Sequence, residues 1–181
     1  MVWSIGVHRG PLRQAIAALK YRGEYHRAQP LGRLLAAYLM ERAPCFEDVD
    51  LIVAMAGGHT MAILVAAAHY LGGMWPLDLP PAGPVLVKRS ATRPMVTLPS
   101  AAARRLWAAG ELRAALAVTD PGRVAGRRVL VVDDVFTDGS TLREVAGTLR
   151  RAGAVAVSGV VLARTPMYPR GKGPGRSAGK V

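Results

Sequence analysis

An acidic pair follows directly after a strongly apolar stretch in the second half of the chain. Residues 129–132 read VLVV, the pattern of a strand buried on both faces of a parallel sheet. The next two residues, Asp133 and Asp134, carry carboxylates that can accept hydrogen bonds from paired hydroxyls such as those of a ribose, or approach a metal ion. We therefore expect these two carboxylates at the carboxyl end of a strand, where open α/β sheets bind ligands.

A polar turn separates the acidic pair from a helix. After the turn, apolar side chains recur at helical spacing from Leu142 until Gly153 ends the pattern. The free N–H groups at the start of a helix, together with the positive end of its dipole, favour a phosphate. Acids, turn and helix in this order suit a sugar phosphate. The residues of the turn are Thr137, Asp138, Gly139, Ser140 and Thr141.

Two other interpretations of this segment explain less. A receiver domain also has a strand that ends in an acidic pair, but it needs most of its length after that strand, and here most of the chain precedes it. A plain strand, turn and helix with surface acids leaves the glycine and the hydroxyls of the turn without a role. A phosphate-binding turn accounts for all of these residues.

Composition indicates one globular domain without disulfides. The chain has 181 residues, of which 51% are hydrophobic, enough for one sizeable core. Its single cysteine, Cys45, excludes an internal disulfide and a zinc ribbon. We see no leader sequence, and the longest apolar stretch, residues 61–68, is too short to span a bilayer. These features predict a cytoplasmic protein with no membrane contact.

The formal charge of +12 calls for an anionic partner or another cause. Twenty-four basic residues face 12 acidic ones, and a positive field would favour nucleic acid or the phosphates of a small substrate. The arginines are scattered through alanine-rich helices, so no basic helix face with interleaved aromatics appears, and we expect at most weak nucleic-acid contact. Residues 166–181 are basic, rich in Gly and Pro and poor in apolar side chains, which predicts a disordered tail after a domain over residues 1–165.

Helical and strand patterns alternate along the domain. We expect helices over residues 11–21, from 29 to before Pro44, 61–71 with Thr60 as its cap, from about 100 to 116, and from 142 to before Gly153. We expect strands over residues 50–55, 84–88, 129–132 and 154–162, with a polar loop over 89–100. This alternation predicts an α/β fold with a mostly parallel sheet and helices on both faces.

The segment 129–141 resembles the 5-phosphoribosyl 1-diphosphate (PRPP) signature of type I phosphoribosyltransferases. In that signature an apolar strand, two acidic residues and a T-[TS]-G-x-[TS] turn follow each other without gaps. The resemblance implies a type I phosphoribosyltransferase-like fold and Mg²⁺ as cofactor. It also implies that Asp133 and Asp134 hold the ribose 2'- and 3'-hydroxyls and meet the metal directly or through PRPP, and that residues 137–141 cradle the 5'-phosphate.

Four weaker features extend the resemblance to the ComF-like, competence-associated branch of that family. They lie in order between residues 12 and 164, so the resemblance covers nearly the whole expected domain. Without the amino-terminal zinc ribbon of many relatives, the chain would be a short form. The features are LKYRG at 19–23, a basic residue and a threonine at Arg89 and Thr92, an arginine pair at 104–105, and LAR at 162–164.

Several positions depart from the family pattern. The diphosphate-binding loop falls at Ala56, Gly57 and Gly58, where Ala56 replaces the usual basic residue and the R-G-F-N-Q stretch of competence-type relatives is absent. The two glycine amides could still meet a diphosphate, and His59 could supply charge. Met95 and Trp107 stand where relatives usually carry glutamine and asparagine.

Two further positions bear on ligand binding. Asp138 replaces a threonine or serine of the turn, so a donor to the 5'-phosphate becomes an acceptor-only carboxylate, and rotation toward solvent or a bridging Mg²⁺ would relieve the repulsion. Lys88 and Arg89 begin a loop that could close over the site near the diphosphate.

Three functions remain open. An enzyme would transfer the phosphoribosyl group of PRPP to a nitrogen acceptor and release diphosphate, although Thr137 stands where purine-salvage relatives have an aspartate base. A catalytically weakened phosphoribosyl-binding protein would act in DNA uptake or regulation. A nucleic-acid-binding protein would use the net charge alone. A homodimer is among the expected assemblies.

Overall fold

The computed structural model describes residues 1–79, 83–94 and 97–166. Met95 and the part of the predicted tail from residue 167 onward lie outside these ranges. No helix in the described part of the chain is long and apolar enough to cross a membrane.

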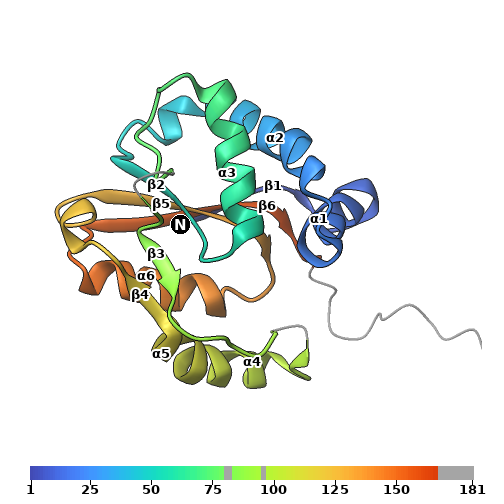
Figure 1. Cartoon of the computed structure of the whole chain (residues 1–181), viewed down its shortest axis with the longest axis vertical. Helices are drawn as coiled ribbons and strands as arrows, with labels where there is room; N and C mark the ends of the chain where they lie inside the picture. Colours follow the sequence, from blue (N-terminus) through green and yellow to red (C-terminus); the bar gives the residue numbers. More distant parts are fainter. Residues whose placement is uncertain (80–82, 95–96, 167–181) are drawn as a thin grey trace, which may run out of the picture.

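A four-stranded parallel sheet forms the centre of the fold (Figure 1). Its order is β1-β6-β5-β2, and every neighbouring pair is parallel. The expected mostly parallel sheet is thus confirmed. Its strands are β1 (Val2–Val7), β2 (Leu51–Ala54), β5 (Arg128–Phe136) and β6 (Ala156–Arg164).

Alternate residues of the central strand enter two separate cores. Leu130 and Val132 pack in one cluster with side chains of the first three helices, while Val129 and Val131 pack in a second cluster with those of the later helices. All four are almost fully buried, so β5 is apolar on both faces, as parallel strands between helical layers are. In Figure 1 the first three helices lie on one side of the sheet and α6 on the other, which confirms the predicted helices on both faces.

The first helical layer consists of α1 (Gly10–Arg22), α2 (Ala28–Glu41) and α3 (Gly58–Leu71). The second contains α6 (Ser140–Arg151) and a broken helix made of α4 (Ala101–Trp107), the π-helical η4 (Ala108–Leu112) and α5 (Arg113–Ala115). Short 3₁₀ turns are η1 (Tyr25–Arg27), η2 (Ala43–Cys45) and η5 (Pro121–Arg123). A two-stranded antiparallel ribbon, β3 (Leu86–Lys88) and β4 (Leu116–Val118), lies beside the broken helix.

The structure corrects three details of the sequence-based expectations. The helix expected up to residue 116 ends at Ala115, and Leu116 begins β4, which pairs with β3. Strand β1 was not expected. Thr60 does not cap α3, because its hydroxyl lies inside the first turn and donates to the carbonyls of Met55 and Gly57.

Gly32 lets α2 and α3 approach closely. A Cβ at this position would lie 2.6 Å from the Cβ of Ala66 and 2.7 Å from the backbone N of Ala67. The neighbouring atoms belong to helix backbone and a short side chain, so they cannot move aside without separating the two helices. Gly147 in α6 is also inside a helix, but its added Cβ would meet only the flexible end of Arg151, at 3.4 Å.

We predict opposite effects of alanine at these two glycines. Gly32→Ala should lower the free energy of unfolding by about 1–3 kcal/mol, because it overpacks the α2–α3 contact. Gly147→Ala should raise it by roughly 0.5–1 kcal/mol, because alanine favours the helix. Urea unfolding of both variants measures the difference, and a Gly32→Ala variant as stable as the wild type would contradict the packing.

Candidate functional site

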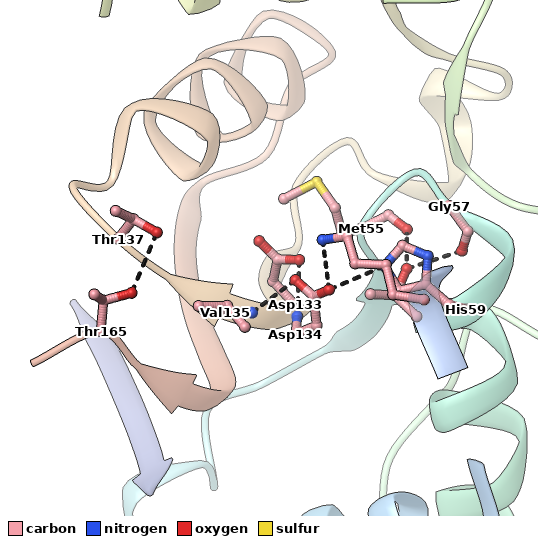
Figure 2. A network of polar contacts seen from close by, with 10 residues as sticks. Met55, Gly57, His59, Asp133, Asp134, Val135, Thr137 and Thr165 are labelled. Atoms are coloured by element: carbon pink, nitrogen blue, oxygen red, sulfur yellow. Dashed lines mark hydrogen bonds and ion pairs between the residues drawn. The ribbon is translucent and has the colours of Figure 1, made fainter. Parts of the chain in front are cut away.

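A cavity of about 710 Å³ opens at the carboxyl end of β5. Its walls come from α1, the loop after β2, the end of β3, α4 and the end of β5, so segments far apart in the sequence meet here. Figure 2 shows the carboxylates of Asp133 and Asp134 between His59 on one side and the Thr137 and Thr165 pair on the other. The acidic pair therefore lies at the strand end, as expected, although β5 itself continues to Phe136.

Asp134 is held by two basic side chains of the first helical layer. Its Oδ2 lies 2.6 Å from Nζ of Lys20 and 3.2 Å from Nε2 of His59, and its Oδ1 accepts the N–H of Val135 at 2.7 Å. Burial of this carboxyl opposes ionisation, but the hydrogen bond from His59 and the charge of Lys20 outweigh it and hold the pKa of Asp134 well below its ordinary value. The same pair raises the pKa of Lys20 despite the burial of that ammonium.

Asp133 has the opposite electrostatics. Burial raises the pKa of Asp133, and the neighbouring charge of Asp134 raises it further, while Lys20 only partly compensates. One carboxylate oxygen, Oδ1, accepts the N–H of Asp134 at 2.8 Å. The site thus holds one firmly ionised carboxylate beside one whose ionisation is disfavoured.

The polar turn is held by a glycine in the left-handed conformation and by hydrogen bonds to Asp138. Gly139 has φ +77°, and a Cβ there would lie 3.0 Å from Cζ of Phe136, so both backbone and space call for glycine. Asp138 Oδ1 accepts the N–H of Ser140 at 3.1 Å and its hydroxyl at 2.7 Å. Its Oδ2 accepts Nε of Arg104 from α4 at 2.8 Å. The carboxylate of Asp138 is thus paired with an arginine and not rotated into solvent.

Burial opposes ionisation of Asp138, yet the hydrogen bonds from Ser140 and Arg104 lower the pKa of this carboxyl. It is therefore an anion at neutral pH, seated at the start of α6. Helix starts favour such a charge.

Four more of the expected site residues line this cavity. They are Ala56, Lys88, Thr137 and Thr141. The Nζ of Lys88 lies 3.3 Å from Oγ1 of Thr92, and burial followed by the charge of Lys20 lowers the pKa of Lys88. The threonine hydroxyls of residues 137 and 165 are 3.4 Å apart.

Six expected residues are not part of the cavity lining. Three belong to the polar turn, Asp138, Gly139 and Ser140, which border a separate small hollow with Phe136 and Leu142. The other three are Gly57, Gly58 and Arg89. Gly57 precedes the first turn of α3, and Gly58 begins that helix, where it borders a separate groove with Tyr25. Arg89 has its N–H on the carbonyl of Ala115, and its side chain does not line the cavity.

Sequence reasoning missed how the cationic side chains reach the acids. Lys20 and Arg104 belong to two motifs that the sequence singled out, LKYRG and the arginine pair, but no pattern linked them to carboxylates 114 and 34 residues away. His8 and Arg13 also line the cavity without having been expected there. Trp107 lines it too, with a buried Nε1 that has no hydrogen-bond partner in the described part of the chain.

A divalent metal would find only part of its ligand set in the protein. The described residues contain no group of three or more metal-ligating side chains. Asp133 and Asp134 fit the one or two carboxylates that Mg²⁺ takes when substrate phosphates complete its shell. The donor set therefore fits a magnesium ion that arrives together with a phosphate-bearing ligand.

Comparison with known proteins connects this site to a family. Residues 85–172 match the family model of the phosphoribosyl transferase domain. Over 38 residues the chain is 55% identical to the transcriptional regulator GfcR of Methanospirillum hungatei. This matched segment is 21% of this chain and 19% of that protein.

Solved structures are also similar to this chain. The structure of the allosteric regulatory enzyme of purine biosynthesis is similar with a TM-score of 0.51 and 26% identity, over 75% of this chain and 26% of that one. For glutamine PRPP amidotransferase from B. subtilis the TM-score is 0.48 and the identity 28%, over 74% of this chain and 25% of that one. For purine phosphoribosyltransferase from Pyrococcus horikoshii the TM-score is 0.42 and the identity 23%, over 77% of this chain and 76% of that one. The chain spans about a quarter of the first two structures.

The predicted resemblance to type I phosphoribosyltransferases is confirmed for the fold and for the matched segment. That segment supplies Asp133, Asp134, Asp138 and Arg104. Lys20 and His59, which hold Asp134, come from outside it.

The two adjacent carboxyls should affect stability with opposite signs. Asp134 has a depressed pKa, so its contribution is present above the unfolded-state pKa of about 4 and is lost as pH falls through the folded-state pKa. Asp133 has a raised pKa, so its burial is tolerated best below about pH 4 and costs stability as pH rises toward the raised value.

At pH 8 Asp133→Asn should therefore raise the free energy of unfolding and Asp134→Asn should lower it, each by about 1–3 kcal/mol. The Asp133 difference should shrink as pH falls toward 4, whereas the Asp134 difference should persist at pH 4 and shrink only below it. Chemical unfolding at several pH values measures them, with Asp120→Asn at an exposed turn as control. Equal effects of the same sign at pH 8 would contradict the assignment.

Proposed function

We propose that this chain, whose residues 85–172 match the phosphoribosyl transferase domain, binds PRPP and transfers its phosphoribosyl group to a nitrogen acceptor. The observation that carries the proposal is the pair of buried carboxylates at the end of β5, beside a glycine turn that opens a helix. The cavity of about 710 Å³ has the size usual for small-molecule sites, so it has room for a ligand and an acceptor beside the acids.

In this reaction the bond between C1 of the ribose and the diphosphate oxygen breaks, and a bond from the acceptor nitrogen to C1 forms. The diphosphate leaves with the bonding electrons, and the acceptor nitrogen loses a proton. Because the sugar becomes cationic on the way, a protein accelerates such a reaction mainly by positioning the groups and stabilising the leaving charge. Mg²⁺, when bound with PRPP, would neutralise part of the diphosphate charge.

The chain's own residues divide this work. Asp133 and Asp134 would accept hydrogen bonds from the ribose 2'- and 3'-hydroxyls, and the N–H groups of residues 137–141 would hold the 5'-phosphate. Lys20 and His59 both contact Asp134, which keeps this carboxylate ionised. Lys88 faces the same cavity and can reach the diphosphate.

The basic residue usual in the diphosphate loop is replaced by Ala56, so the charge for the leaving group must come from elsewhere. Lys20 lines the same cavity as Ala56 and would supply this charge. This role also gives a reason for the LKYRG segment at 19–23, and it supports placing the chain in the ComF-like branch. We further propose that residues 1–165 form the catalytic domain and that the following basic tail does not contribute to it.

A second function has its own support. A phosphoribosyl-binding protein with little turnover, acting in regulation or DNA uptake, fits the missing cation at Ala56 and the carboxylate of Asp138 in the phosphate turn. The local match to a protein described as a transcriptional regulator points the same way. Both functions require PRPP binding, and only the first requires release of diphosphate.

Calorimetric titration of PRPP with Mg²⁺ tests the shared part of the proposal. We expect micromolar to millimolar binding by the wild type and no measurable binding by the Asp133→Asn, Asp134→Asn double variant, because the ribose loses both acceptors. The opposing stability effects of the two changes should leave the double variant folded. Unchanged affinity in this variant would remove the acidic pair from the site.

A diphosphate-release assay then separates the two functions. We expect release from PRPP in the presence of nitrogenous acceptors, with a panel of free purine and pyrimidine bases as probes. Binding without release for every base in the panel would favour the regulator.

A further inference from the structure

We propose that Arg104 of α4 is a ligand of the 5'-phosphate and that Asp138 holds it at the turn. This inference rests on the proposed function and deepens it, because it names a phosphate-binding residue that lies outside the signature. It starts from the ion pair between Arg104 Nε and Asp138 Oδ2 at 2.8 Å. Both side chains are largely buried yet reachable, with 21% and 17% of their side-chain surface exposed.

The first argument is what Asp138 removes from the turn. Its carboxylate engages the N–H and the hydroxyl of Ser140, two donors that would otherwise face a phosphate at the start of α6. It also adds a negative charge where a threonine or serine would donate. A phosphate at this turn therefore needs replacement donors and a compensating positive charge.

The second argument is what Arg104 offers in return. Its Nε is used by Asp138, while its Nη1 and Nη2 have no acceptor among the described residues. A guanidinium bound at one edge keeps its other N–H groups in a fixed fork, which suits a phosphate. Arg104 lines the large cavity together with Thr137 and Thr141, so its free edge borders the space beside the turn.

The third argument is the charge balance of the two residues together. Asp138 alone would repel a phosphate, and Arg104 alone would lack an anchor beside it. As a pair they return the turn to the charge that a hydroxyl residue would give, and they present extra donors. Asp138 is then a positioning residue that acts through Arg104. The adjacent Arg105 is exposed, has no ion pair in the described part of the chain, and does not line the cavity, so it provides a matched control.

The test is calorimetric titration with ribose 5-phosphate and, separately, with PRPP and Mg²⁺. Arg104→Ala should weaken ribose 5-phosphate binding at least tenfold, and Arg105→Ala should change it less than twofold. In the Arg104→Ala background, the further change Asp138→Asn should recover part of the lost affinity, because the uncompensated carboxylate is then gone. The loss should be larger at low salt, where the phosphate charge is least screened.

The outcomes separate this inference from the function on which it rests. If the wild type binds PRPP and Arg104→Ala binds ribose 5-phosphate within twofold of it, or more tightly, the role of Arg104 is overturned and the proposed function stands. If the wild type binds neither compound, both are overturned. Thermal unfolding confirms that each variant is folded, and Arg104→Gln, which keeps a polar side chain but no charge, replaces any alanine variant that is not.

Discussion

The ion pair between Lys20 and Asp134 is the interaction on which the site depends. Two adjacent carboxylates at the end of a buried strand repel each other, and burial opposes the ionisation of both. The ammonium of Lys20, 2.6 Å from Asp134, fixes which of the two carries the charge. It also ties α1, the first helix of the chain, to the end of the central strand. Without it, only His59 would remain of the two basic side chains that offset the burial of Asp134.

The same solution occurs twice at this edge of the sheet. Asp134 is held by Lys20 and His59 from the first helical layer, and Asp138 is held by Arg104 from α4 in the second. Asp133 has no such partner and bears the cost of burial. Functional sites often retain side chains that lower the stability of the fold. The buried carboxyl of Asp133 is such a side chain.

Much of the fold followed from the sequence, and the electrostatics of the site did not. The run at 129–132 marked β5 because it is unbroken and rich in valine, and apolar side chains at helical spacing after Leu142 marked α6. Strands β1 and β4 were missed, since one contains Ser4 and Gly6 and is only half buried, and the other is three residues long after a helical pattern. The cations at the acids depend on how whole helices pack, which no local pattern encodes.

A crystal structure of the chain with PRPP and Mg²⁺ tests the central claim most directly. We predict that the ribose 2'- and 3'-hydroxyls lie within hydrogen-bond distance of Asp133 and Asp134, and that the 5'-phosphate lies against residues 137–141. Lys20 should then have moved from Asp134 toward the diphosphate. PRPP bound away from the end of β5, or a ribose that leaves both carboxylates without contact, would contradict the account.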